Sequence, residues 1–151
     1  MKYLLLFLSA LIPSQAFAAN TVSLASEVYV EKIVEKDGKR DTKLEAPKVV
    51  VPGDKLVFVL SYKNNGAAPA ADFEVTNPIP DAVAYESVEG DALVSVDGGK
   101  NWGQLAALKV KQADGTERAA GTSDVTHVRW KFARAIAAGE SGKLSFRGVV
   151  K

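Results

Sequence analysis

Hydrophobic and polar residues alternate along several short stretches of this chain. The clearest stretch runs from Lys55 to Lys63, and bulky apolar residues occupy every second position of it. They are Leu56, Phe58, Leu60 and Tyr62. Because successive side chains of a β-strand point to opposite faces, this spacing predicts a strand with one apolar face. Beyond the N-terminal segment no helical period persists, so the pattern predicts an all-β protein.

Turn-forming residues separate these stretches. A Pro-Gly-Asp turn at 52–54 precedes the first strand described above, an Asn-Asn-Gly turn at 64–66 follows it, and Asp37-Gly38 suits a two-residue hairpin. About nine strands are therefore expected, which is enough for two packed sheets. Their expected ranges are Val28 to Lys36, Lys39 to Glu45, Lys55 to Lys63, Asp72 to Thr76, Val83 to Val88, Ala92 to Val96, Gln104 to Lys111, Val125 to Ala133 and Lys143 to Val150.

The strand from Lys55 to Lys63 also has an apolar second face, formed by Val57 and Val59. Large apolar patches on a protein surface are normally covered. Two covers fit this face. The hairpin formed by residues 28–45 folds over it, or a partner protein does.

The first eighteen residues have the pattern of a secretory signal peptide. Lys2 provides the positive charge, Leu4 to Ile12 the apolar segment, and Ala16-Phe17-Ala18 the small-residue cleavage site. The apolar segment is too short to span a bilayer as a stable helix. We therefore expect cleavage after Ala18 and export to the periplasm, the outer surface or the medium. The processed chain is expected to have no stable membrane insertion.

Charge and cysteine content narrow the function classes. The chain of 151 residues has 19 basic and 18 acidic side chains and no cysteine. Basic and acidic residues alternate, as in Glu31-Lys32 and Glu35-Lys36, whereas nucleic-acid binding needs a clustered positive face. We expect no nucleic-acid partner and no disulfide, so the core has to stabilise the domain alone.

One motif is similar to a hairpin known from other proteins. Residues 95–102 read Ser-Val-Asp-Gly-Gly-Lys-Asn-Trp and resemble the Asp-box, S-x-D-x-G-x-x-W, which recurs in sialidases and other propeller proteins. The chemistry of this motif is structural, because the aspartate accepts backbone hydrogen bonds and the tryptophan packs under the loop. Asp97, Asn101 and Trp102 form a possible ligand loop, in which Trp102 could contact a sugar. A propeller glycosidase is disfavoured, since it needs several copies of the motif.

Residues for catalysis or metal binding are sparse. His127 is the single histidine and is expected to face solvent. A metal site usually needs several His, Cys or clustered carboxylate ligands. Asp97, Asp91 and Glu89 could supply oxygens to calcium, but the spacing of a dedicated calcium loop is missing. No serine lies in a G-x-S-x-G elbow. We therefore expect no enzyme activity, no cofactor and no metal.

The motifs at 52–80 and 128–146 together resemble a bacterial immunoglobulin-like surface repeat, the conserved repeat domain known as domain-of-unknown-function family eleven. The carrying residues are the PGD turn, NNGAAPA at 64–70, the Ile79-Pro80 stop, Val128-Arg129-Trp130, and IAAGES at 136–141. Ala138 stands where the family usually has proline. The resemblance covers roughly residues 50–151, with an insertion around residues 91–123. It implies an immunoglobulin-like β-sandwich in an extracytoplasmic setting, and it transfers no catalytic or binding residue.

These observations predict three segments. Residues 1–18 are a signal peptide, residues 19–49 an N-terminal β-hairpin extension, and residues 50–151 an immunoglobulin-like sandwich. The leading hypothesis is an exported, non-catalytic module with a structural or protein-interaction role in the cell envelope or at the cell surface. The alternative is a carbohydrate-binding module that uses the Trp102 loop, with Tyr29 and Tyr85 as further stacking residues. An exposed Trp102 would favour the alternative, and a buried one would oppose it.

Overall fold

The structure, a computed structural model, describes residues 22–151. The predicted signal peptide lies outside the described residues. The all-β prediction is confirmed, because ten strands and only two single-turn 3-10 helices make up the regular structure. The strands are β1 (Val22–Lys36), β2 (Lys39–Glu45), β3 (Lys55–Asn64), β4 (Glu74–Pro78), β5 (Val83–Val88), β6 (Ala92–Ser95), β7 (Lys109–Lys111), β8 (Glu117–Ala119), β9 (His127–Lys131) and β10 (Ser141–Val150).

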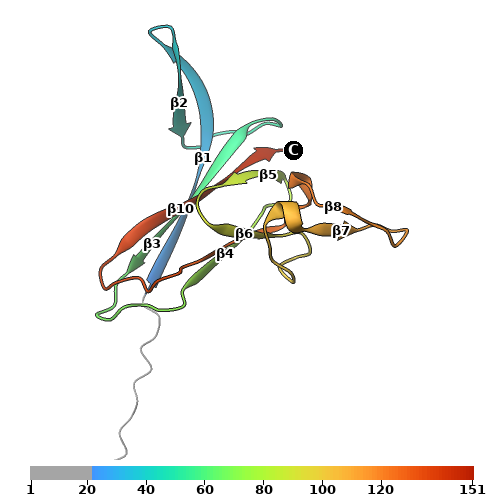
Figure 1. The fold of residues 1–151 in the computed structure, drawn as a ribbon. Helices are drawn as coiled ribbons and strands as arrows, with labels where there is room; N and C mark the ends of the chain where they lie inside the picture. Colours follow the sequence, from blue (N-terminus) through green and yellow to red (C-terminus); the bar gives the residue numbers. More distant parts are fainter. Residues whose placement is uncertain (1–21) are drawn as a thin grey trace, which may run out of the picture.

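Two antiparallel sheets form the body of the molecule, as expected for a β-sandwich. The larger has the order β2-β1-β3-β10-β5, and the smaller has the order β4-β9-β6. The hairpin of β7 and β8 forms a third, two-stranded sheet that projects from the body (Figure 1). Among the described residues, no helix is long and apolar enough to cross a membrane.

The core lies between the two main sheets and follows the alternation seen in the sequence. Phe58 of β3 and Phe146 of β10 stack with ring centroids 4.4 Å apart, and Trp130 of the smaller sheet lies 6.3 Å from Phe146. Phe146 and Val128 are fully buried. Close-packed aromatic and branched side chains from both sheets therefore form one hydrophobic core.

The outer face of β3 is covered by neighbours within its own sheet. Val57 is 3% exposed, and its cross-strand neighbours are Tyr29 of β1 and Arg147 of β10. The hairpin of β1 and β2 continues the sheet sideways, so neither of the two covers considered from the sequence is needed to bury Val57. The physical reason is that Arg147 spans the face, bonding Glu31 at 3.3 Å, and large in-sheet side chains shield Val57 from solvent.

The strand β1 belongs to both the sandwich and the projecting hairpin. Its residues 22–31 pair with β3 over ten consecutive positions, whereas its residues 30–36 pair with β2. Nearly every residue of β2 is exposed, and the outer part of this hairpin extends beyond the body (Figure 1). The first half of the predicted N-terminal extension is therefore a strand of the larger sheet, paired with β3.

The segment from Gln104 to Lys111, predicted as one strand, has a different structure. Leu105–Ala107 is a 3-10 turn, and β7 contains only Lys109–Lys111. The turn lets Leu105 and Leu108 both pack against the core. A strand would direct two residues three positions apart to opposite faces, so core packing favours the turn here.

Candidate functional site

The predicted ligand loop follows β6 and is held together by the carboxylate of Asp97. Its Oδ1 accepts hydrogen bonds from the Ser95 hydroxyl at 2.8 Å and from the backbone N–H groups of Lys100 and Asn101 at 3.1 and 2.9 Å. The Asn101 side chain donates to Oδ2 at 2.6 Å. Gly98 and Gly99 adopt positive φ, as the Asp-box resemblance requires. The structure therefore brings Asp97 and Asn101 together.

These donors stabilise the ionised carboxylate. The bond from the backbone N–H of Asn101 has the largest effect, and the bonds from the side chains of Asn101 and Ser95 add to it, so the pKa of Asp97 lies well below its usual range. Both oxygens of the carboxylate accept hydrogen bonds from groups of the loop itself. Asp97 therefore acts as a structural anchor and has little capacity left for a ligand.

Trp102, the predicted sugar platform, is partly buried and has its own intramolecular partners. Its indole N–H donates to the carbonyl oxygen of Gly99 at 2.9 Å. The guanidinium carbon of Arg129 lies 3.8 Å from the indole ring centroid, and the ring of His127 lies 6.2 Å away in an edge-on geometry. A cation–π contact with Arg129 therefore occupies one face of the ring. The Trp102 loop is thus closed rather than open for stacking.

The remaining sequence candidates do not extend this loop into a site. Tyr85 is 8% exposed and belongs to the core, so it cannot stack on a sugar. Tyr29 lies on the outer face of the larger sheet, beside Val57. His127 is half-buried, in contrast to the expected exposure, because its Nδ1 lies 3.0 Å from the Thr126 hydroxyl and its ring lies against Trp102. Within residues 22–151, no group of three potential metal ligands is present.

Replacing Asp97 with asparagine is expected to destabilise the protein at neutral pH. Because the folded-state pKa of Asp97 is lowered, its carboxylate stabilises the fold above the usual aspartate pKa of about 3.9, and this contribution is lost as the pH falls through the lowered value. Urea unfolding should therefore show a difference between wild type and Asp97→Asn that is constant above about pH 5 and shrinks as the pH falls from about 5 toward about 2. A difference that stays constant over this lower range would contradict the anchoring role.

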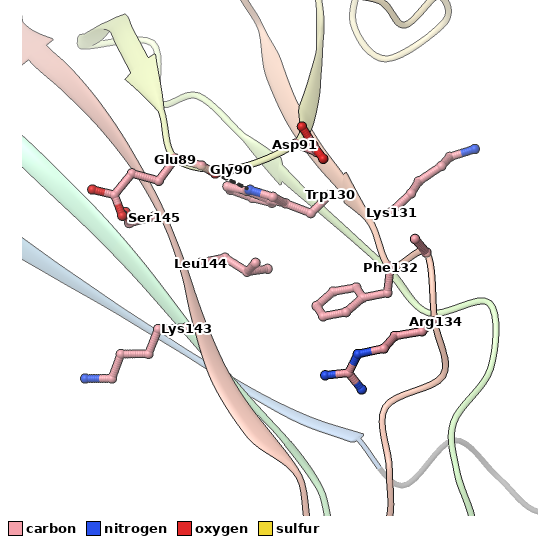
Figure 2. A pocket seen from close by; sticks show the side chains of 11 residues that line it. Glu89, Gly90, Asp91, Trp130, Lys131, Phe132, Arg134, Lys143, Leu144 and Ser145 are labelled. Carbon is pink, nitrogen blue, oxygen red and sulfur yellow. Dashed lines mark hydrogen bonds between the residues drawn. The ribbon is translucent and has the colours of Figure 1, made fainter.

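A second feature, which the sequence did not reveal, is an open groove between β10 and β9. It has a volume of about 400 Å³, and the apolar side chains Trp130, Phe132 and Leu144 face it. Figure 2 shows Leu144 and Phe132 pointing into the space between the two sheets, below the loop that carries Glu89. We call this opening the seam groove. Phe132 and Leu144, which pack against the core, are partly exposed here, whereas Trp130 is buried beneath them.

The seam groove exists because β5 is shorter than β10. The pairing of β5 with β10 ends at Val88 and Phe146, and the backbone N–H of Glu89 then donates to the carbonyl oxygen of Ser145 at 3.0 Å. Alternate residues of a strand direct their backbone groups to the same side, so those of Lys143 also point toward the place that β5 has left. Within residues 22–151, no backbone hydrogen bond on that side satisfies Lys143.

Charged groups surround the groove. Glu89 accepts hydrogen bonds from the Ser145 hydroxyl at 2.7 Å and from Arg147 at 2.9 Å, and these bonds lower the pKa of its carboxyl group. Lys143 and Asp91 lie on the groove's rim without an ion pair to any described residue. The site thus combines an apolar floor, one free backbone edge and unpaired charges of both signs.

Sequence reasoning missed the seam groove because each of its residues has an ordinary role in its own strand. The signal that could have found it is a difference in strand length. Val83 to Val88 is followed at once by Glu89-Gly90, a turn signal, whereas the last strand is longer. Two paired strands of unequal length leave an exposed edge.

We compared the chain with protein-family models, with curated proteins and with solved structures, and none of the three comparisons found a match. The resemblance to the immunoglobulin-like surface repeat therefore rests on the residues quoted for it.

Proposed function

We propose that this protein is an exported, non-catalytic module that binds another protein of the cell envelope or cell surface, and that the seam groove is its binding site. The observation that carries the proposal is the free backbone edge of Lys143 beside the partly buried apolar side chains of Leu144 and Phe132, which line the groove. An extended peptide segment can pair with such an edge and place every second side chain in the groove.

The chemistry of the groove favours a peptide over a sugar. Its floor is apolar, and a backbone N–H and C=O stand at its side, which matches a strand of alternating apolar and polar residues. Lys143 and Asp91 offer charges of opposite sign to polar residues of that strand. The carbohydrate alternative relies on Trp102, and Arg129 already covers one face of its ring. Protein binding is therefore the better supported function.

Site-specific photocrosslinking in the producing cells tests this proposal. Ala133 is exposed on the rim of the groove, so a photoreactive residue placed there should form an adduct with a second polypeptide. Ala113, an exposed alanine after β7 and remote from the groove in sequence, is the matched control position and should give little adduct. Equal adducts from both positions, no polypeptide adduct, or an adduct with glycan alone would overturn the proposal.

A further inference from the structure

The exposed edge of β1 is a second interaction surface, separate from the seam groove. β1 pairs with β3 from Val22 to Glu31, but β2 covers its other side only from Val30 onward. Residues 22–29 therefore have a strand on one side and, within the described part of the chain, no strand on the other. We call this eight-residue stretch the β1 edge.

The hairpin geometry identifies the backbone groups that this edge presents. Asp37 and Gly38 form a two-residue loop, so the residues on each side of it, Lys36 and Lys39, are a hydrogen-bonded pair. Because hydrogen-bonded positions recur at every second residue, the even-numbered residues of β1 direct their backbone N–H and C=O groups toward β2. Before β2 begins, the same alternation directs the backbone groups of the even-numbered residues to the open side. Four residues therefore present backbone N–H and C=O groups there: Val22, Leu24, Ser26 and Val28.

The β1 edge lacks the features that normally prevent strand addition. It contains no lysine, arginine or proline, and Glu27 is its single charged residue. Leu24 is 49% exposed although it lies on the face of the sheet that packs against the core elsewhere. By contrast, β2 carries Lys39, Arg40 and Lys43, and β4 ends at Pro78. The outer strands β2 and β4 are thus protected by charge or proline, and the β1 edge is not.

We propose that the β1 edge binds a second copy of this chain, by antiparallel pairing around a two-fold axis at Ala25. In this register the backbone of Leu24 forms hydrogen bonds with that of Ser26 in the second copy, and the backbone of Val22 does so with that of Val28 in the second copy. Every free backbone N–H and C=O group of the edge therefore has a partner. Symmetric pairing of one edge with itself closes after two copies. The two larger sheets then become one continuous sheet.

Charge and length select this arrangement. Glu27 faces Ser23 of the second copy, so the one charge of the edge meets no like charge. A register in which Glu27 of one copy lies opposite Glu27 of the other would move the two-fold axis toward β2. On that side β1 is already paired from Val30 onward, where Glu45 is its partner, so a second copy cannot pair beyond Tyr29. The axis at Ala25 also brings the two exposed Leu24 side chains to a diagonal position on the same face, where they can bury one another. These two features, the pairing of Glu27 with Ser23 and the contact between the two Leu24 side chains, arise only when the edge pairs with a second copy of itself.

A single cysteine tests the register directly, because the chain has none of its own. At the axis, Ala25 faces its counterpart in a non-hydrogen-bonded pair with a Cα separation of about 4.5 Å, which lies within disulfide range. The purified exported protein with Ala25→Cys should oxidise to a covalent dimer. Ala71→Cys, at an exposed alanine outside the strands, is the matched control and should stay largely monomeric. Equal dimer formation by both variants would overturn the proposed register.

Sedimentation measures the association itself. The wild type should be a dimer, and Ser26→Pro should be a folded monomer, because proline removes an N–H that points away from β3 and is tolerated at sheet edges. If Ser26→Pro does not fold, Leu24→Lys serves the same purpose, with Leu44→Lys on β2 as its control. A monomeric wild type, or a dimer that survives Ser26→Pro and Leu24→Lys, would overturn the proposal. Both results are independent of the seam groove.

Discussion

Replacing Trp130 with alanine is expected to lower the free energy of unfolding by about 3 to 5 kcal/mol, the usual cost of truncating a large core aromatic residue. Trp130 is 3% exposed, lies against Phe146, and donates its indole N–H to the carbonyl oxygen of Glu89 at 3.2 Å. The substitution would leave a cavity between the two sheets. Urea unfolding followed by far-UV circular dichroism measures the loss.

The second tryptophan provides the control for this prediction. Trp102 is partly buried in the Asp97 loop and lies outside the core cluster, so Trp102→Ala should destabilise the protein clearly less than Trp130→Ala. Equal and small losses for the two variants would mean that the core does not lie between the sheets as described.

Replacing Asn64 with aspartate is expected to cost about 3 kcal/mol or more, although the two side chains have the same shape. Asn64 is fully buried, and its Nδ2 donates to the carbonyl oxygens of Ala68 and Ile136, both at 2.9 Å. Its Oδ1 accepts from the backbone N–H of Gly66 at 2.9 Å. A carboxylate would lose the donors and place a charge against two carbonyl oxygens.

The pH dependence of this variant has a definite sign. Burial raises the pKa of a carboxyl group in the folded state, so the Asn64→Asp variant should be least destabilised at low pH and lose stability as the pH rises through the raised value. The neighbouring Asn65→Asp is the matched control, and because Asn65 is exposed its effect should be within about 0.5 kcal/mol. If both variants behave alike in urea unfolding, Asn64 does not hold the turn together.

The fold was largely predictable from local pattern. The alternation in β3 and the turn residues on each side of it identified the strand and its buried face, since both signals act over a few residues. Asn64 shows the limit of such signals. In the sequence it resembles an ordinary turn residue, but it is buried because residues around Ile136, far away in the chain, fold over it.

The same distinction between local and long-range contacts applies to the candidate sites. The hydrogen bonds of Asp97 and of the Trp102 indole were predictable, because their partners lie within residues 95–102. The contact of Arg129 with Trp102 was not, since it depends on the pairing of β6 with β9. The seam groove and the β1 edge depend on where one strand stops beside another. That information lies in the strand register, which only the assembled sheets define.

The proposed binding of a partner strand at the seam groove is tested most directly by a pair of substitutions at Lys143. Lys143→Pro removes the backbone N–H that a partner strand would use, whereas Lys143→Ala removes the side chain and keeps the backbone group. Crosslinking from Ala133 in the producing cells is then compared in the two backgrounds, with thermal unfolding to show that each variant is folded. We predict that the adduct persists with Lys143→Ala and is lost with Lys143→Pro. Equal adducts in both folded variants would contradict strand addition at this groove.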